Sequence, residues 1–440
     1  MSRICMIGTG YVGLVSGACL ADFGHEIWCV DINEKRIADL HAGVMPIYEP
    51  GLDRLVAKDV GGGRLFFTTS LAEAMEHTDV IFIAVQTPMS DTGEADLTYV
   101  LNVAEEIGGL MRKSYVIVTK STVPVGTSRK VERAIRGAQP EPIPFDMASN
   151  PEFLREGSSI EDFMRPDRVI IGTESAHAEK IMREIYRPLY LLETPIVHGS
   201  IESAELIKYA CNAFLAVKIS YINEISQLAD HVGADVSLVA RAMGLDKRIG
   251  PKFLHAGLGF GGSCLPKDTN AIVHIAREAG GDMSIVRAAI AVNAALPDVA
   301  MAKARDLLPD LQGRTVALLG LSFKPNTDDI RDAPARRLVD LLSEAGATLR
   351  VHDPVAMDNF RGIRPDLLYC DGPYHAVEGA DLTLLVTEWN EYRQLDLSRA
   401  AALMAGRRFL DCRNVYNHEM MAEHGIEYRS FGRPPGGSPA

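Results

Sequence analysis

The segment GTGYVG at residues 8–13 decides the fold of this chain. It is a complete GxGxxG motif that follows a short apolar segment, Arg3–Ile7, and opens a segment with helical periodicity. Gly8 permits a tight turn, Gly10 lets the backbone approach a pyrophosphate, and Gly13 lets the helix pack closely on the strand. The helix N-terminus adds free N–H groups and the positive end of its dipole. The motif therefore predicts a strand, turn and helix that bind a dinucleotide.

An acidic residue ends the next expected strand. Asp31 directly follows Glu26–Val30, where a carboxylate accepts hydrogen bonds from the ribose hydroxyls of adenosine and repels a 2′-phosphate. Arg36 stands nearby and weakens this preference, because an arginine can accommodate a phosphate. The balance predicts NAD as the cofactor in preference to NADP.

Strand-like and helix-like segments alternate in two parts of the chain, which predicts parallel sheets. The first part extends to about residue 198, and the second begins at Arg314 with an apolar strand that again leads into glycine. The further expected elements are the strands Thr78–Val85, Tyr115–Thr119, Thr315–Leu319, Thr348–His352 and Leu382–Thr387, and the helices Gly13–Phe23 and Ala333–Ala345. We therefore expect an α/β protein with two Rossmann-like, doubly wound parallel-sheet domains.

The middle of the chain has helical periodicity and few strand signals. Expected helices cover Glu202–Val232 and Thr269–Leu296 on either side of a glycine-rich interruption. The expected domains are a dinucleotide-binding domain at 1–198, a central helical segment at 199–300 that serves dimerisation and substrate binding, and a second α/β domain at 301–430. Residues 431–440 are rich in Gly, Pro and Ser, which predicts a disordered tail.

Charge and cysteine content exclude several classes of protein. The net charge of −13 argues against a general nucleic-acid or anionic-membrane surface. The sequence has no apolar run of about 18 residues, and its first residues lack the pattern of a signal peptide. The seven cysteines are widely spaced without a CxxC pair, which favours a reducing compartment, the cytoplasm, and predicts neither a disulfide framework nor a metal site.

A second glycine-rich loop, GLGFGGSCLPKD at residues 257–268, contains the strongest nucleophile signal. Its glycines allow the backbone to wrap closely round a ligand, and Cys264 follows them. Lys267 and a helix that starts after the glycines can stabilise a thiolate, and Asp268 can move or position a proton. The alternative, a buried inert cysteine, is the interpretation for Cys5, Cys19, Cys29 and Cys211, which stand in apolar segments.

Other polar residues have weaker signals. Glu152 and Glu156 are four residues apart after an expected strand, a spacing typical of a solvated helix start. Lys208 and Asn212 have the same spacing on an expected helix, where a surface lysine is the more common outcome. Short polar segments also follow several strands: Thr87-Pro88, Lys120-Ser121-Thr122-Val123, Phe323-Lys324 and Asp328-Asp329-Ile330-Arg331. Taken alone, these are ordinary loop residues at the edge where α/β proteins bind ligands.

Together these residues resemble the UDP-glucose/GDP-mannose dehydrogenase family over nearly the whole chain. GFGGSCLPKD, SNPEFLREG, STVPVGT and GLSFKPNTDDIRDAP are specific in combination. The resemblance implies two Rossmann-like domains joined by a helical segment that forms a homodimer, and it assigns a UDP-sugar to the second domain. Arg248, in RIGPKFL, resembles an arginine that reaches the substrate of the neighbouring subunit.

The resemblance also implies residue roles. Cys264 matches the nucleophile, Lys208 the catalytic lysine and Asn212 its partner, with Glu152, Thr122 and Asp268 handling protons and water. The cofactor side is matched by the turn residues Gly8, Gly10, Tyr11, Val12 and Gly13, and by Asp31, Arg36, Thr87, Ser121, Thr122, Glu156, Lys267 and Arg331. The substrate side is matched by Glu152, Phe153, Leu154, Lys208, Asn212, Arg248, His255, Gly257, Gly259, Phe260, Gly261, Lys324 and Arg413.

These parts imply a four-electron oxidation of UDP-glucose at C6 to UDP-glucuronate through a Cys264 thiohemiacetal and thioester. RIGPKFL and Ser263 favour UDP-glucose, whereas Gln86 departs from the small residue or asparagine usual at that position. The same chemistry on GDP-mannose or a UDP-N-acetylhexosamine is the alternative. A single-step β-hydroxyacid dehydrogenase needs neither the cysteine loop nor residues 314–418, and a non-catalytic nucleotide-binding protein would not need this set of polar residues. The general base stays open between Glu152 and a water held by Asp268 and Thr122.

Overall fold

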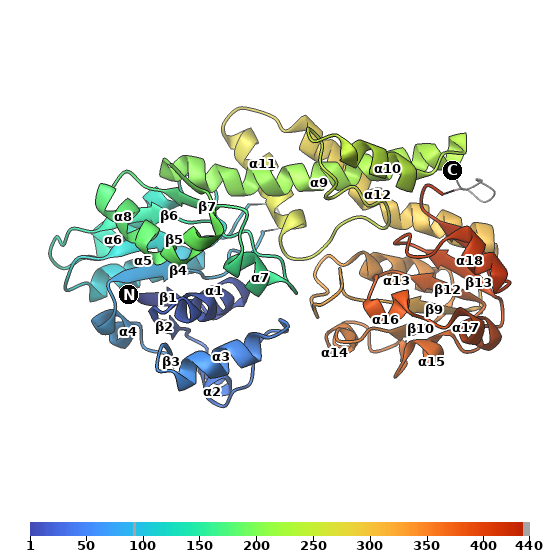
Figure 1. Cartoon of the computed structure of the whole chain (residues 1–440), viewed down its shortest axis with the longest axis horizontal. Helices are drawn as coiled ribbons and strands as arrows, with labels where there is room; N and C mark the ends of the chain where they lie inside the picture. The colour runs from blue at the N-terminus through green and yellow to red at the C-terminus, as the bar shows by residue number, and fades with distance from the viewer. Residues whose placement is uncertain (91–93, 434–440) are drawn as a thin grey trace. The chain divides into compact units, whose positions relative to one another are not determined.

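The computed structural model describes residues 1–90 and 94–433 (Figure 1). Contacts divide the chain into two compact units, the first formed by residues 1–211 and 270–280 and the second by residues 212–269 and 281–440. Two helices, α9 (Ile201–Val232) and α11 (Leu265–Glu278), contribute residues to both units. The division of the chain into three domains stays a prediction, although the boundary expected near residue 300 falls inside helix α12 (Ser284–Leu307).

The first unit is built on an eight-stranded sheet with the order β3-β2-β1-β4-β5-β6-β7-β8. Its strands are β1 (Arg3–Ile7), β2 (Glu26–Val30), β3 (Leu65–Thr68), β4 (Val80–Ile83), β5 (Val116–Thr119), β6 (Asp146–Ser149), β7 (Val169–Gly172) and β8 (Ile196–Gly199). Every neighbouring pair is parallel except β6 and β7. The first six strands therefore have the order of a dinucleotide-binding Rossmann fold.

Helices cover both faces of this sheet (Figure 1). They are α1 (Tyr11–Asp22), α2 (Glu34–His41), α3 (Leu52–Gly61), α4 (Leu71–His77), α5 (Thr98–Leu110), α6 (Thr127–Ala138), α7 (Ser159–Met164), α8 (Ala176–Ile185) and the 3-10 helix η1 (Arg187–Leu192). Ile4 and Met6 of β1 join the core shared with α1, whereas Cys5 and Ile7 join the core shared with α4, α5 and α6. A strand buried on both faces is uniformly apolar, which is why the sequence signal of β1 is a continuous run.

The second unit contains a six-stranded parallel sheet with the order β11-β10-β9-β12-β13-β14. Its strands are β9 (Thr315–Leu319), β10 (Thr348–His352), β11 (Leu368–Tyr369), β12 (Leu382–Leu385), β13 (Arg408–Asp411) and β14 (Glu427–Ser430). Its further helices are α10 (Val236–Leu245), α13 (Pro334–Glu344), α14 (Met357–Arg361), α15 (Pro373–Val377), α16 (Asn390–Arg393), α17 (Leu397–Leu403) and α18 (His418–Glu423). The strand order repeats that of the first unit, so the predicted class of two Rossmann-like domains is confirmed.

The helix expected over Thr269–Leu296 is wrong as a single element. Helix α11 ends at Glu278 and α12 begins at Ser284. The break contains Gly280, whose φ is +78°, a left-handed conformation that a helix cannot contain. Gly280 and Gly281 thus separate the two helices.

Helix α12 is long and apolar enough to cross a membrane by length and composition. However, its side chains Leu296, Ala300 and Ala304 are fully buried. Ala300 and Ala304 belong to the hydrophobic core that includes Leu338 of α13. We therefore interpret α12 as a helix that packs one side on the core of the second unit.

The predicted disordered tail begins too early. Phe431 is fully buried in the core of the second unit, and its N–H and carbonyl both bond the side chain of Asn414, at 3.0 and 2.9 Å. The composition of 431–440 did not indicate that Phe431 is ordered, because Gly, Pro and Ser dominate the residues after it. Residues 434–440 lie outside the described part of the chain.

Candidate active site

The GTGYVG turn leads from β1 into α1 with the geometry that its glycines predict. Gly8 has φ +101°, and a Cβ there would lie 2.6 Å from the carbonyl oxygen of Ala84. A Cβ at Gly13 would lie 1.8 Å from the carbonyl oxygen of Gly8. At Gly10, by contrast, a Cβ would meet no protein atom within 4 Å, and no side chain caps α1 there. The turn therefore leaves space and backbone N–H groups for a pyrophosphate.

Asp31 stands at the carboxyl end of β2 as a fixed carboxylate. Its Oδ2 accepts hydrogen bonds from the N–H and the hydroxyl of Thr9, at 2.9 and 2.8 Å, and from Arg36 at 3.0 Å. Burial tends to raise its pKa, but these bonds and one from the Asn33 N–H hold the pKa below its ordinary value. Because Arg36 is paired with Asp31, the positive charge of Arg36 is partly neutralised and attracts a 2′-phosphate less strongly. The ionised Asp31 therefore favours NAD.

A network that sequence reasoning missed joins this turn to the segment after β6. Glu49 is buried and accepts hydrogen bonds from the hydroxyl of Tyr11, from the Gly157 N–H at 2.6 Å and from the Ser159 N–H at 2.8 Å. The partners of Glu49 are far away in the sequence, so no local pattern marks it. The contact ties the cofactor turn to the loop that contains Glu152.

Glu152 and Lys208 form a buried ion pair. Lys208 Nζ lies 2.8 Å from Glu152 Oε1, and the two side chains are only 4% and 5% exposed. The second carboxylate oxygen accepts the Leu154 N–H at 2.6 Å. The predictions of a solvated helix start at Glu152 and of a surface lysine at Lys208 are therefore both wrong. Residues 151–155 are not helical, and both charges are removed from water. Burial tends to raise the pKa of Glu152, but Lys208 and the Leu154 N–H hold it below its ordinary value.

Neighbouring site residues complete this part of the first unit. Phe153 has the Lys208 Nζ 5.3 Å from its ring centre, and Arg168 stacks on the same ring at 3.8 Å. Leu154 packs against the core and Glu156 is buried. Lys208, Phe153 and Glu152 thus share one environment, although Phe153 and Glu152 belong to a loop and Lys208 to α9.

The segments after β4 and β5 are joined to each other. The hydroxyl of Thr87 donates to the Thr122 carbonyl at 2.9 Å, and the hydroxyl of Ser121 donates to the Val85 carbonyl at 2.6 Å. Thr87 and Ser121 are buried. The structure therefore brings the predicted residues Thr87, Ser121 and Thr122 together at the carboxyl edge of the sheet, where ligands bind in this fold.

In the second unit, Cys264 directly precedes the first residue of α11. Asp268, one turn later, is buried and bonds two predicted site residues, Asn212 Nδ2 and Lys267 Nζ, each at 2.6 Å. Cys264 is half-buried, and its sulfur lies 3.6 Å from the Ser263 hydroxyl. Cys264 thus stands at the N-terminus of α11, the end of a helix where negative charge is stabilised. The buried, inert interpretation applies to Cys5, Cys19 and Cys29, because burial raises the pKa of each thiol. Cys211, predicted to be buried as well, is only half-buried.

The glycines before Cys264 are required by packing within the protein. A Cβ at Gly259, whose φ is +82°, would lie 2.2 Å from Asn293 Oδ1, and a Cβ at Gly261 would lie 2.2 Å from the carbonyl oxygen of Asp332. The backbone N–H and carbonyl of Phe260 both bond the Asn293 side chain, at 2.8 and 3.0 Å. Asn293, which sequence reasoning missed, therefore fixes the loop that precedes the cysteine. Gly257 is buried in this loop, and His255 is exposed at its start.

Arg413 connects this loop to the second sheet. Its guanidinium donates to the carbonyls of Val386 at 2.7 Å and Gly259 at 3.2 Å. The half-buried Lys324 follows Phe323, and its Nζ lies 5.4 Å from that ring centre. The Arg331 carbonyl accepts the Gly262 N–H at 2.9 Å. Arg248 stands apart from these contacts, with a side chain that is 89% exposed and paired with Asp246.

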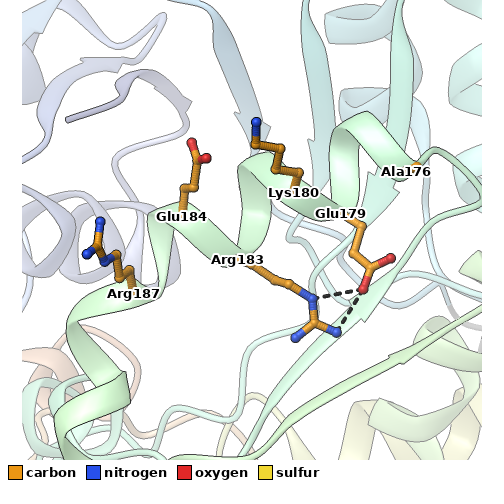
Figure 2. Close-up of a pocket in the computed structure, with 6 residues that line it drawn as sticks. All are labelled: Ala176, Glu179, Lys180, Arg183, Glu184 and Arg187. Atoms are coloured by element: carbon orange, nitrogen blue, oxygen red, sulfur yellow. Dashed lines mark hydrogen bonds and ion pairs between the residues drawn. The ribbon is translucent and has the colours of Figure 1, made fainter.

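A pocket on the surface of the first unit has a different character (Figure 2). It follows one face of α8 and is lined by Ala176, Glu179, Lys180, Arg183, Glu184 and Arg187. None of these is a predicted site residue, and Arg183 and Glu179 pair one helical turn apart. We interpret it as a solvated helix face.

The fold, the glycine turn and the carboxylate after β2 define an NAD-dependent oxidoreductase. Its second domain also has a fold of the nucleotide-binding type. Residues 2–190, 202–295 and 317–418 match, respectively, the NAD binding domain, the central domain and the UDP binding domain of the UDP-glucose/GDP-mannose dehydrogenase family. The chain belongs to this family.

Relatives of known function are similar over the full length. The UDP-glucose 6-dehydrogenase of Rhizobium meliloti (strain 1021) is 50% identical, with 98% of this chain and 100% of that protein covered. The UDP-glucose 6-dehydrogenase of Pseudomonas aeruginosa is 45% identical, with 99% and 98% covered. Among solved structures, a UDP-glucose dehydrogenase from Pyrobaculum islandicum has a TM-score of 0.90 at 40% identity, with 98% of this chain and 97% of that chain covered. These matches set aside the hydroxyacid dehydrogenase and the non-catalytic alternatives.

Proposed function

We propose that the protein catalyses the NAD-dependent, four-electron oxidation of UDP-glucose at C6 to UDP-glucuronate. The observation that carries the proposal is a pair of contacts on α9: Lys208 bonds Glu152 and, one helical turn later, Asn212 bonds Asp268. Residues four apart share a helical face. This helix therefore presents a cation and an amide that are each fixed by a buried carboxylate. The activities of the relatives support UDP-glucose as the substrate.

Cys264 supplies the covalent step. The C6 alcohol is oxidised to an aldehyde, and the Cys264 thiolate adds to the aldehyde carbon to form a thiohemiacetal. Oxidation of this adduct gives a thioester, and attack by water breaks the C–S bond, releases the acid and restores the thiol. NAD, when bound, accepts a hydride in each of the two oxidations. The covalent bond retains the reactive aldehyde between the two oxidations.

Lys208 and the carboxylates handle charge and protons. The ammonium of Lys208, fixed by Glu152, stabilises the negative charge that develops on the substrate oxygen, an effect of several kcal/mol in a dry site. Proton transfer belongs either to Glu152 or to a water held by Asp268 and Thr122. Both carboxylates are buried and already accept hydrogen bonds, which orients their oxygens.

We also propose that the protein works as a cytoplasmic homodimer in which Arg248 reaches the neighbouring active site. Helix α9 exposes Phe214, Leu228 and Val232 to 64%, 55% and 65%, and α10 exposes Leu245 to 78%. Large apolar side chains gathered on two helices are typical of a subunit interface. The 89% exposure of Arg248 leaves it available to a second chain.

The experiment that tests the function is the amount of NADH formed per sugar nucleotide consumed. With limiting UDP-glucose and excess NAD, we expect two NADH per UDP-glucose and UDP-glucuronate as the product. One NADH with free aldehyde or ketone would contradict the thioester scheme. Two NADH only with GDP-mannose or UDP-N-acetylglucosamine would retain the mechanism and change the substrate.

A further inference from the structure

Lys120 is a buried cation that the proposed chemistry does not use. It follows β5, is 2% exposed, and donates to Asn150 Oδ1 at 3.1 Å. Its Nζ also lies 3.4 Å from the Tyr186 hydroxyl, which donates to the same Asn150 oxygen at 2.6 Å. Asn150 is itself fixed by a bond from its Nδ2 to the Ile170 carbonyl, at 2.8 Å. The polar partners of the ammonium are therefore neutral groups in a rigid network.

Two charged residues of the proposed site, Glu152 and Lys208, act on the Lys120 ammonium. Asn150 and Glu152 are two residues apart in the loop after β6, so the bond from Lys120 to Asn150 reaches the segment that contains Glu152. Glu152 and Lys208 act electrostatically on Lys120, Glu152 by attraction and Lys208 by repulsion. Burial of one carboxylate with two ammonium groups leaves an excess of positive charge, which strongly favours the ionised carboxylate.

We propose that Lys120 is a positioning residue for the reaction: its buried positive charge holds Glu152 as a carboxylate beside Lys208, and its bond to Asn150 fixes the loop that contains Glu152. The inference rests on the proposed function, because Lys120 is assigned an effect on the reaction only through Glu152 and Lys208. It gives a reason for a cation at a position where an ordinary loop residue would be solvated.

The titration of Lys120 falls within the working range of pH. Burial, followed by repulsion from Lys208, lowers its pKa to about 8. The titratable side chains that act on it are Glu152, Lys208 and Cys19. Burial raises the pKa of the Cys19 thiol and of the bonded Tyr186 phenol, so both stay neutral. At the lower pH where Glu152 titrates, Lys120 is charged, and loss of that charge raises the pKa of Glu152. The effect therefore belongs to the acid limb of the pH profile.

A matched pair of variants separates charge from packing. Lys120→Gln retains a donor for Asn150 but removes the charge, whereas Lys120→Arg retains the charge. In kcat/KM against pH, we expect Lys120→Gln to move the acid limb upward by roughly 1 pH unit, the usual effect of a nearby charge. Lys120→Arg keeps the limb near its wild-type position even where its rate is lower. Tyr186→Phe, which removes a neutral partner, also leaves the limb in place.

Three results would overturn the inference. One is a lower kcat or melting temperature in Lys120→Gln while the acid limb of kcat/KM against pH stays at its wild-type position. Another is an equal shift in Lys120→Arg, and the third is an acid limb that persists in Glu152→Gln. If Lys120→Gln fails to fold, Lys120→Met is the second neutral variant. The position of its acid limb is then compared with that of the wild type in the same way. Wild-type enzyme that gives two NADH from a different sugar nucleotide would change the proposed substrate, and the comparison of limbs would then be made with that substrate.

Discussion

At the scale of single residues, Cys264 makes the sharpest prediction. Cys264→Ser replaces the sulfur with an oxygen that is a much weaker nucleophile, so formation of the acid should fall by a factor on the order of 10³ or more. Binding of NAD and UDP-glucose, measured by calorimetry, should be unchanged. Cys370→Ser is the matched control, because Cys370 is buried and lies outside the proposed site. Acid formation near the wild-type rate in Cys264→Ser would exclude the covalent scheme.

The pair of Glu152 and Lys208 predicts how stability depends on pH. Lys208→Met leaves a buried carboxylate without its partner, which should cost about 3–5 kcal/mol of unfolding free energy at pH 7. The folded-state pKa of Glu152 lies below its ordinary value, so the pair contributes stability above that ordinary value. This contribution is lost as the pH falls through the lowered pKa. Urea unfolding of wild type and Lys208→Met should therefore give curves that converge in acid, and a constant difference at every pH would contradict this account.

These two residues also show where sequence reasoning ends. The resemblance pointed to Glu152 and Lys208, but their spacing alone predicted a solvated helix start and a surface lysine. The reason is physical: the partner that buries each charge is 56 residues away in the sequence, and local periodicity carries no information about it. Glu49 and Asn293 were missed for the same reason, and Lys120 was predicted to be an ordinary loop residue, because each acts through a contact between distant segments.

At the scale of elements, α9 holds the start of α6 through Glu205. The Glu205 carboxylate accepts the backbone N–H groups of Gly126 and Ser128, at 2.6 and 2.8 Å, and is buried. Glu205→Ala would leave both N–H groups without this acceptor, at about 1–3 kcal/mol each. The loop with Ser121 and Thr122 should loosen as a result, so we expect a lower melting temperature and a higher KM for NAD.

Glu202→Ala is the control for this variant. Glu202 is on the same helix but pairs with Arg129 at the surface, with a side chain that is 41% exposed. Surface pairs contribute about 0–1 kcal/mol, so the melting temperature of Glu202→Ala should change little. Equal losses in the two variants would show that the position on α9 matters and that the bonds to α6 do not.

The exposed apolar side chains of α9 and α10 predict the oligomeric state. A charge at Phe214, which is 64% exposed, should disrupt a subunit interface, so Phe214→Asp should sediment as a monomer where the wild type sediments as a dimer. Ile363→Asp is the matched control, since Ile363 is 44% exposed and follows α14, outside α9 and α10. A monomeric wild type, or a dimer that survives Phe214→Asp, would contradict the proposed interface.

At the scale of the whole molecule, alternation of strands and helices predicted the fold class because buried parallel strands are apolar on both faces. The ends of β1, β2, β9 and β10 were predicted to the residue, because a glycine, charge or polar residue ends each apolar run. The break between α11 and α12 and the burial of Phe431 were not predictable in this way. The break depends on the left-handed conformation of Gly280, and the burial of Phe431 depends on packing in the hydrophobic core of the second unit.

The repeated strand order raises the question of whether each chain binds one NAD or two. Asp353, at the end of β10, matches the position of Asp31 at the end of β2, and Gly320 has φ +104°, like Gly8 at +101°. The two carboxylates differ in their surroundings. Asp353 is fully buried and accepts bonds from the Leu321 and Ser322 N–H groups and from the Trp389 indole, at 2.8, 3.1 and 3.2 Å.

Asp353 is fully buried, whereas the Asp31 side chain keeps 10% of its surface exposed, so a ribose can reach only Asp31 and calorimetry should give one NAD per chain. Asp31→Ala should weaken NAD binding, because Asp31 lies at the cofactor turn, and it should also cost some stability, because it leaves the buried Thr9 N–H without this acceptor. Asp353→Ala should instead destabilise the second unit, because it leaves buried N–H groups without an acceptor. Two NAD per chain, or NAD affinity that falls equally in both variants, would show that the second fold still binds a dinucleotide.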